Sequence, residues 1–543
     1  MTQHKNRNYK HVHALSWSSQ THKMKSFLLL FGAIASPVSS VSVQLSSNAP
    51  SGAPVISGSH ISLSLEQDRW TDWVGLNSRN QFFFNTLDNL ARITGEPPFI
   101  RIGANSEDHT NFNQALQSPQ TAFPPPTTTV PYPEASTIVV GDAYYQAARF
   151  LPPNTHVIWG VNFGQNNLTA AVLEAQSIAK AFSSSAITNA GISLDLLEIG
   201  NEADLYRNNG FRPSTFNISQ YVKEWINFAN NVSTAGGISS SSKRKFFGGA
   251  FAGSGHSNTS FSPQGMFANG ILSSAPGSQI STISQHHYSG SFCSGNGGLL
   301  QDLMTKSTIR SNLSMFIPDI AASRARNLDY VLGETNSYSC HGAPGVSNTA
   351  GAALWTLDYA LFARSLNITK VYFHEGIGYK YNLIQPVTLN RSTTDGSNLP
   401  SPLPPHVQPQ YYAAIIAAEG IENSGNTKIS EISVNNTRIS GYAFYQENKL
   451  ARAIFVNSQA FLSSSTNRSQ VHLDFAFTGT TPSQMTVKRL AIGHADDTSG
   501  LLWGGQTYET ADGHVAGTLS QEEHSVQEGL DLVASEAVLV TFK

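Results

Sequence analysis

Two glutamates stand directly after short apolar runs that lie more than a hundred residues apart. Glu202 follows the run at 194–199, and Glu334 follows the run at 330–332 and one glycine. An apolar run that ends in polar residues is typical of a buried parallel strand that stops at the mouth of a pocket. Two carboxyl groups at such strand ends can flank a glycosidic bond, where one protonates the leaving oxygen and the other attacks the anomeric carbon.

Strand-like and helix-like segments alternate around these glutamates. Short apolar or alternating segments are separated by segments with apolar residues at three- and four-residue spacing. This alternation predicts a parallel β/α architecture, and eight units fit a (β/α)8 TIM barrel in which Glu202 ends strand four and Glu334 ends strand seven. An open doubly wound sheet is the alternative, but no glycine-rich phosphate loop follows the first strand. The expected strands are 60–65, 99–102, 157–162, 194–199, 246–250, 280–284, 330–332 and 371–373, and the expected helices are 143–149, 170–182, 218–231, 307–327 and 349–363.

The pattern of apolar and polar residues changes along the chain and divides it into several parts. After about residue 425, short alternating runs punctuated by Gly, Asn, Asp and Ser predict an all-β sandwich domain. Two proline-rich stretches follow strands two and eight, so both are expected to wall the active face, although plain surface loops are the alternative. These stretches are 117–135 and 383–408. The expected parts are an N-terminal extension with a signal peptide (1–40), a strand joining the sandwich (41–58), the catalytic barrel (59–420) and the β-sandwich (421–543).

The composition favours a secreted protein. Charged residues are only 13% of the chain, about half the usual share, and polar uncharged residues replace them. A net charge of −3 and a pI near 6.6 argue against a nucleic-acid partner. The segment 24–40 has a basic start, an apolar core too short to span a bilayer and small residues up to Ser40, which predicts a secretory signal. The alternative is a signal anchor. Met24 is a candidate for the true start, with residues 1–23 as an extension, and no later stretch is long and apolar enough to span a membrane.

Glycosylation sequons and the cysteines point to the same compartment. Only two cysteines occur, Cys293 and Cys340, and a lone pair in an oxidising compartment is expected to form a disulfide, with two free thiols as the alternative. Nine Asn-x-Ser/Thr sequons are glycosylation candidates. They are Asn167, Asn217, Asn231, Asn258, Asn312, Asn367, Asn390, Asn435 and Asn467.

Four stretches carry the pattern of a known family: IRIGANSED at 100–108, LEIGNEADLY at 197–206, QHHYSG at 285–290 and GETNSYSCHGAPGVSNTAGAALWTLDYAL at 333–361. Through them the chain resembles the clan A glycoside hydrolases, in which an Asn-Glu pair ends strand four and a second Glu ends strand seven. More narrowly, it resembles fungal members of glycoside hydrolase family 79, the β-glucuronidase and heparanase-related family. The β-rich tail resembles the C-terminal domain of that family.

This resemblance implies roles for the strand-end residues. Glu202 would be the acid/base, Glu334 the nucleophile, and Asn201 would bind the sugar 2-hydroxyl. Physical chemistry agrees with this division, since an acid/base needs a raised pKa and a nucleophile needs donors that keep it ionised. Tyr288 and Arg101 are candidates to hold Glu334 ionised, and a purely structural ion pair is the alternative for Arg101.

Further polar residues are candidates for binding the sugar. The family meets the substrate carboxylate with tyrosine hydroxyls and backbone amides, which implies Tyr379, Tyr381 and the His341–Gly342 backbone here. Packing against the barrel rim is the alternative for both tyrosines. Independently of the resemblance, Glu66 and Asn105 end strands one and two, where they could bind sugar hydroxyls.

A metal site is the weaker interpretation of the strand-end polar residues. It would use a cluster of histidines with one glutamate, but no CxxC or HExxH spacing supports it. We therefore expect neither a metal nor a cofactor. The residues of this alternative are His286, His287, His341, His374 and Glu375.

These observations together predict a secreted, retaining, exo-acting β-glucuronidase. A slightly acidic chain suits sulfated polymers poorly, and the long stretches after strands two and eight favour a closed pocket for terminal β-glucuronic acid, with or without a 4-O-methyl group. The expected partner is a glycan that contains glucuronic acid. The alternatives are a heparanase-like endo enzyme, a clan A hydrolase of a neutral sugar and a barrel that binds glycans without turnover.

Overall fold

The computed structural model describes residues 39–253 and 255–543. The extension and signal sequence expected over 1–40 lie outside the described residues, apart from 39 and 40. Residues Ser39–Lys543 form one compact unit. Within the described part of the chain, we find no helix with the length and apolar character needed to cross a bilayer.

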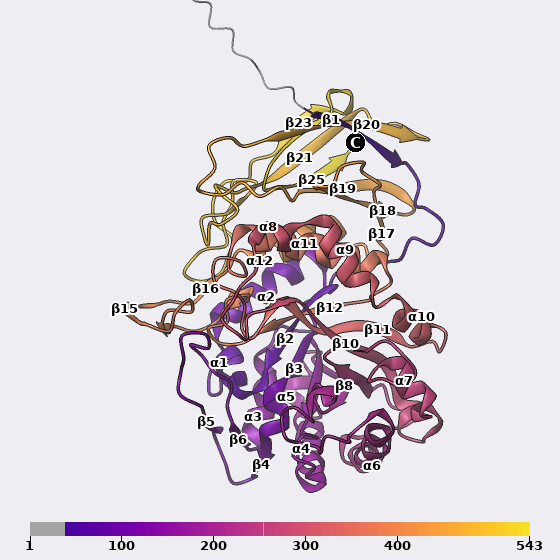
Figure 1. The fold of residues 1–543 in the computed structure, drawn as a ribbon, viewed down its shortest axis with the longest axis vertical. Coiled ribbons are helices and arrows are strands. Elements are labelled where there is room, and N and C mark those ends of the chain that lie inside the picture. Colours follow the sequence, from indigo (N-terminus) through magenta and orange to yellow (C-terminus); the bar gives the residue numbers. More distant parts are fainter. Residues whose placement is uncertain (1–38, 254) are drawn as a thin grey trace, which may run out of the picture. The chain divides into compact units, whose positions relative to one another are not determined.

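Eight parallel strands close into a barrel, which confirms the predicted (β/α)8 architecture (Figure 1). The strands pair in the order β10-β11-β12-β2-β3-β7-β8-β9. Two of them, β10 and β11, continue past the predicted ends at 284 and 332, because the residues that follow are polar but still belong to the ladder. The barrel strands are β2 (Ile61–Glu66), β3 (Ile100–Gly103), β7 (His156–Val161), β8 (Ser193–Ile199), β9 (Lys245–Phe251), β10 (Ile280–Ser291), β11 (Asp329–Ser339) and β12 (Val371–Glu375).

The helices around the barrel depart from the predicted set in two ways. The single helix predicted at 307–327 is wrong: α9 (Lys306–Ser314) stops before α10 (Ile317–Arg324), which carries Pro318 in its first turn, where proline is tolerated. The predicted set also lacks two long helices, α2 (Gln81–Thr94) and α12 (Gln410–Ile421), and the short helices α1 (Trp70–Val74), α5 (Ser185–Thr188), α7 (Pro263–Ala268) and α8 (Leu300–Met304). The helix α12 is buried on nearly every side, so its sequence shows no amphipathic period. The other predicted helices are present as α3 (Asp142–Gln146), α4 (Leu168–Phe182), α6 (Ile218–Gly236) and α11 (Ala350–Ser365).

The two proline-rich stretches are not loops throughout. Each contains short paired strands. Proline is accepted in β15 because this strand pairs with only one neighbour. The first stretch contains β5 (Gln120–Ala122), which pairs with β6 (Thr137–Val140); β6 also pairs with β4 (Thr110–Phe112). The second contains β13 (Ile384–Gln385) paired with β16 (His406–Val407), and β14 (Leu389–Arg391) paired with β15 (Asn398–Leu403).

Two sheets that share one apolar core form the C-terminal domain. The strand nearest the N-terminus, β1 (Ser39–Ser46), pairs in parallel with β20 (Gln470–Thr478). Val43 of β1 and Leu473 of β20 pack in the same cluster as Phe455 of the larger sheet. The smaller sheet has the order β1-β20-β24 (Leu530–Val533). The larger sheet contains β17 (Lys428–Glu431), β18 (Ile439–Gln446), β19 (Lys449–Asn457), β25 (Glu536–Phe542), β21 (Gln484–Ala491), β22 (Leu502–Trp503) and β23 (Glu522–Ser525).

An ionic cluster around the buried carboxylate of Asp358 joins this domain to the barrel helices. Arg310 of α9 pairs with Asp358 of α11 at 2.8 Å and with Glu431 of β17 at 2.7 Å. The Tyr442 hydroxyl on β18 donates to Asp358 at 2.5 Å. Because each buried charge has a partner, the cluster can be accommodated without an unpaired ion in the interface.

Candidate active site

A cavity of about 630 Å³ opens at the carboxyl ends of the barrel strands. Both glutamates singled out in the sequence line it, although they come from β11 and from the turn after β8. The fold therefore brings the two carboxyl groups to one site, as strand-end placement predicts. The lining residues are Asn105, Val130, Glu134, Glu202, Leu205, Asn209, Ala252, Tyr288, Gly290, Cys293, Glu334, Ser339, Cys340, His341, His374 and Tyr381.

Glu202 is held in a tight turn that begins where β8 ends. Gly200 and Glu202 both have φ in the left-handed region, at 77° and 48°. The left-handed region costs a non-glycine residue about 1–2 kcal/mol, so other contacts must hold the turn. The Glu202 N–H donates to the Ala250 carbonyl at 2.8 Å, and the Asn201 N–H donates to the Asp108 carboxylate at 3.3 Å.

Glu334 lies among strong hydrogen-bond donors. Its Oε2 accepts from Arg101 Nη1 at 2.8 Å, and its Oε1 accepts from the Tyr288 hydroxyl at 2.8 Å. Arg101 is fully buried. Its Nε and Nη2 also donate to Oε2 and Oε1 of Glu198, at 2.9 and 2.5 Å. A fourth contact runs from Arg101 Nη2 to Oδ1 of Asn201 at 2.8 Å. The guanidinium therefore forms the structural ion pair considered for it and also positions Glu334.

The surroundings of Glu334 favour its ionised form. Burial alone would raise its pKa, but positive charge at His374, His286 and Arg101, with the hydrogen bond from Tyr288, outweighs burial and lowers the pKa well below its ordinary value. Burial lowers the pKa of both histidines to about 4, so they carry charge only in acid. At neutral pH, Arg101 and Tyr288 are the groups that hold Glu334 ionised.

The surroundings of Glu202 favour its protonated form. Burial raises its pKa to about 8. The negative charges of Glu334 and Glu198 also raise this pKa, whereas the positive charge of Arg101 lowers it. Its Oε1 is hydrogen-bonded to His286 Nδ1 at 3.0 Å, and its side chain keeps 14% exposure toward the cavity. Two neighbouring carboxyl groups with pKa values pushed apart can act as an acid and a nucleophile.

The two carboxyl groups lie close together. Oxygens of Glu202 and Glu334 and one ring nitrogen of His286 lie within 4.8 Å of one another. Such a trio has the donor types and closeness to hold a metal ion, but it equally fits a pair of carboxyl groups that flank one glycosidic bond. The wider metal site considered from the sequence does not form. His287 Nδ1 bonds to the Tyr359 hydroxyl, and Glu375 accepts from the backbone N–H groups after β12.

Several residues expected to bind the sugar do border the cavity. Asn105, Tyr288, His341 and Tyr381 all line it. Asn201 lies directly behind, and its Nδ2 donates to Asn105 Oδ1 at 3.2 Å. These residues therefore remain predicted binding residues, with the side chain of Asn201 oriented by Arg101.

Three other predicted binding residues do not border the cavity. Glu66 is buried, and its oxygens accept from the backbone N–H groups of Asn105 and Ser106, because the chain turns over this carboxylate after β3. The Gly342 N–H is used internally, donating to the Tyr338 carbonyl at 3.0 Å. Tyr379 stacks behind His341 with 3.7 Å between the ring centroids. Local backbone hydrogen bonds use the Glu66 carboxylate and the Gly342 amide, so their role in binding the sugar stays a prediction. Tyr379 takes the packing role considered for it.

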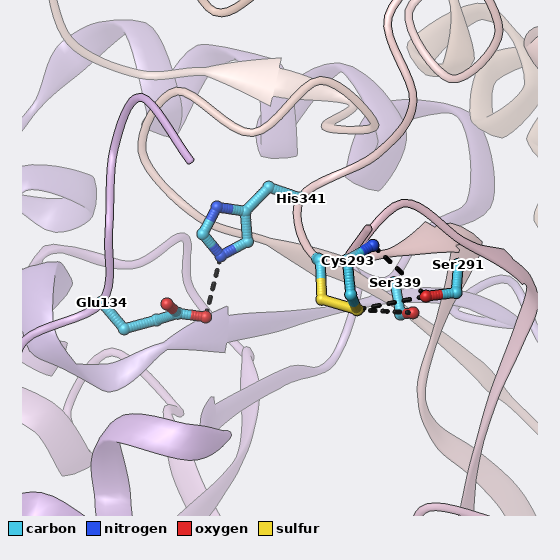
Figure 2. The surroundings of a disulfide bond; sticks show 6 residues. Glu134, Ser291, Cys293, Ser339 and His341 are labelled. Atoms are coloured by element: carbon cyan, nitrogen blue, oxygen red, sulfur yellow. Dashed lines mark hydrogen bonds and ion pairs between the residues drawn. A yellow bond between two sulfur atoms is a disulfide. The ribbon is translucent and has the colours of Figure 1, made fainter. Parts of the chain in front are cut away.

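Glu134 is a cavity residue that sequence analysis did not single out. It lies in the proline-rich stretch 117–135, where it is the only charged residue, and this isolation was the available signal. Its Oε1 accepts a hydrogen bond from His341 Nε2 at 2.8 Å. Figure 2 shows Glu134 turned toward His341, beside the disulfide at the rim of the cavity.

The expected disulfide between Cys293 and Cys340 is confirmed. It joins the segments that follow β10 and β11, and both cysteines line the cavity. Cys340 and His341 have φ values of 59° and 69°, both in the left-handed region. The covalent link therefore fixes a strained turn that presents His341 to the cavity.

Replacing Arg101 by methionine should destabilise the protein strongly at neutral pH. The variant leaves Glu198 and Glu334 buried without their cation, which costs about 3–5 kcal/mol of unfolding free energy. Since Arg101 helps to lower the pKa of Glu334, that pKa rises in the variant. Protonation then relieves part of the penalty, so the deficit relative to wild type should narrow as the pH falls from 7 to 4.

Urea unfolding at both pH values measures this change. Arg92→Met is the control, because its 2.7 Å pair with Asp88 is exposed and should cost less than about 1 kcal/mol. An equal deficit at pH 7 and pH 4 would show that lost packing, not unpaired charge, explains the result.

The chain is similar to known glycoside hydrolases. Residues 441–539 match the model of the glycosyl hydrolase family 79 C-terminal beta domain. A Beta-glucuronidase of Neurospora crassa is 27% identical over 89% of both chains, and one of Aspergillus niger is 28% identical over 87% of this chain and 86% of the relative.

Solved structures show the same fold. A 4-O-alpha-L-rhamnosyl-beta-D-glucuronidase from Fusarium oxysporum 12S has a TM-score of 0.74 and 25% identity, covering 92% of this chain and 100% of that one. A family 51 alpha-L-arabinofuranosidase from Bifidobacterium longum, at 13% identity and a TM-score of 0.57 over 93% of this chain and 100% of that one, shares the fold alone. The resemblance to glycoside hydrolase family 79 seen in the sequence is confirmed by the match to the C-terminal beta domain of that family and by the similarity of the chain to beta-glucuronidases over most of its length.

Proposed function

We propose that the protein is a retaining β-glucuronidase that uses Glu334 as nucleophile and Glu202 as acid/base. The observation that carries this proposal is the approach of the two carboxyl groups to within 4.8 Å. Retaining glycosidases hold their carboxyl groups about 5–5.5 Å apart, whereas inverting enzymes leave about 6.5–9.5 Å for a water molecule. The opposite pKa shifts of Glu202 and Glu334 support the same division of roles.

The reaction then follows two displacements. Glu334 attacks the anomeric carbon while protonated Glu202 gives its proton to the leaving oxygen, so the glycosidic bond breaks and a glycosyl ester forms. Glu202, now ionised, takes a proton from water, which attacks the anomeric carbon and releases Glu334. Asn201, whose side chain Arg101 orients, would hydrogen-bond the 2-hydroxyl, a contact that strengthens as charge develops in the transition state.

The substrate proposed is a terminal β-D-glucuronic acid. Two relatives named beta-glucuronidase and a solved relative that acts on a substituted glucuronide support this class. Among the described residues that line the cavity there is no lysine or arginine, so neutral donors such as the Tyr381 hydroxyl would meet the sugar's carboxylate. The lack of basic lining residues disfavours a heparanase-like endo enzyme for sulfated chains.

Exo action is supported by the wall that Val130 and Glu134 add to the cavity. Both residues come from the insertion at 117–135, and Glu134 bonds to His341 in the turn that follows β11. A cavity walled in this way suits the end of a chain better than its middle.

We also propose that the protein is secreted and N-glycosylated. The disulfide requires oxidising conditions to form and persist. None of the nine sequon asparagines is buried, which leaves each side chain accessible to glycan transfer.

A panel of aryl β-glycosides tests the substrate class. Hydrolysis of the aryl β-glucuronide with little hydrolysis of the matching β-glucoside is the expected result, because the neutral sugar lacks the carboxylate. Equal rates on both would indicate a hydrolase of neutral sugars, and binding without turnover of any glycoside would indicate a glycan-binding barrel.

Substitution of the two glutamates tests their roles. Glu334→Gln should reduce kcat by at least about 1,000-fold on every substrate, because no nucleophile remains. Glu202→Ala should lose less than about 100-fold on substrates with good leaving groups, and added azide should accelerate it and yield the β-glycosyl azide. Near-wild-type activity in both variants would end the assignment.

The pH profile tests the two environments. Wild-type kcat/KM should fall above about pH 8, because Glu202 must hold a proton to protonate the leaving group. Tyr288→Phe removes a donor that lowers the pKa of Glu334, so its acidic limb should move to higher pH. Tyr379→Phe, whose ring lies behind His341, is the matched control and should leave that limb in place. An acidic limb unchanged in Tyr288→Phe would contradict this account of Glu334.

A further inference from the structure

Glu134 is carried into the cavity on an anchored piece of the insertion. Next to it, the Ala135 N–H donates to the buried carboxylate of Asp68 at 2.8 Å. Two residues before it, the Tyr132 hydroxyl donates to the Arg391 carbonyl at 3.0 Å, and the Arg391 N–H donates back to that hydroxyl at 2.9 Å. Contacts on both sides of Glu134 therefore hold its backbone in one place. A residue that recognises a substrate must be held in this way.

The side chain of Glu134 is fixed as well, yet it still faces the cavity. His341 Nε2 donates to one carboxylate oxygen at 2.8 Å (Figure 2). The His341 ring in turn stacks on the ring of Tyr379. The Glu134 side chain nevertheless keeps 29% exposure and lines the cavity. Burial would raise its pKa, but the charge and hydrogen bond of His341 outweigh burial and lower it to about 2. The wall at Glu134 is accordingly negative at neutral pH.

The charge of this wall limits what can lie against it. An ionised carboxylate accepts strong hydrogen bonds from hydroxyl groups and repels another carboxylate at close range. Glu334 is also ionised, and the described lining residues contain no lysine or arginine to offset either charge. A uronic acid in the cavity must then turn a hydroxyl edge, not its carboxylate, toward Glu134.

We infer that Glu134 is a specificity-determining residue that accepts a hydrogen bond from one ring hydroxyl of the terminal uronic acid and orients the sugar by repelling its carboxylate. This inference rests on the proposed glucuronidase function. It assigns a substrate contact to the insertion at 117–135, in addition to its part in walling the cavity.

Deoxygenated substrates test the contact at each ring hydroxyl in turn. Aryl β-glucuronides lacking the 2-, 3- or 4-hydroxyl are compared with the parent substrate, in wild type and in Glu134→Gln. Wild type should lose about 10–100-fold in kcat/KM on the analogue that lacks the contacted hydroxyl, the range for a hydrogen bond to a charged group. In Glu134→Gln that particular loss should shrink to about 3-fold or less, while the losses on the other two analogues should be unchanged.

A merely structural role would lower activity on all substrates alike and would leave the three ratios as in wild type, which would overturn the inference. Glu419→Gln is the matched control, because Glu419 also forms a 2.8 Å ion pair, with Lys488, but does not line the cavity. It should keep all wild-type ratios. If Glu134→Gln does not fold, Glu134→Asp is the second variant, because it withdraws the carboxylate by one methylene. It should likewise reduce the loss of kcat/KM on the analogue that lacks the contacted hydroxyl. Ratios unchanged from wild type in Glu134→Asp would also overturn the inference.

The same experiment separates the two proposals. If wild type does not hydrolyse the parent glucuronide, the proposed function fails. If wild type turns over the parent and the three ratios are the same in wild type and variant, the function stands and the role of Glu134 fails.

Discussion

One buried guanidinium connects the strands that carry the site. Arg101 on β3 donates to Ser64 on β2, to Glu198 on β8, to Asn201 just beyond β8 and to Glu334 on β11. A buried charge is tolerated only when its hydrogen-bonding capacity is used, and here four side chains use it. Because the barrel holds these strands in fixed register, the same contacts also fix where Glu334 and Asn201 can lie. The hydrogen bonds of one buried arginine thus help to fix the positions of the Glu334 and Asn201 side chains.

The different chemistry of the two glutamates arises from their neighbours more than from their burial. Burial by itself raises the pKa of both. Glu334 receives hydrogen bonds from Arg101 and Tyr288, which favour its charge, whereas Glu202 has the neutral ring of His286 and the negative charge of Glu334 beside it. An ionised carboxylate next to a protonated carboxyl group follows from this asymmetry.

Segments outside the barrel ladder decide the shape of the cavity above these glutamates. The disulfide holds the turn that presents His341, and the insertion supplies Glu134 as its partner. The barrel provides rigid strand ends, while loops supply the contacts that differ between substrates. The cluster around Arg310 ties the C-terminal domain to barrel helices, and none of the described residues that line the cavity comes from that domain.

The sequence by itself determined the barrel, the β-rich tail, the disulfide and the strand-end places of Glu202 and Glu334, because each rests on a local pattern or on a unique pair. Only the tertiary structure decided which neighbours the polar side chains meet. Glu134 and His341 are 207 residues apart, and no local period relates them. The backbone partners of Glu66 and of the Gly342 amide likewise depend on how the chain turns after each strand. Patterns of hydrophobicity specify which face of an element is buried, whereas hydrogen-bond partners follow from the packing of distant segments.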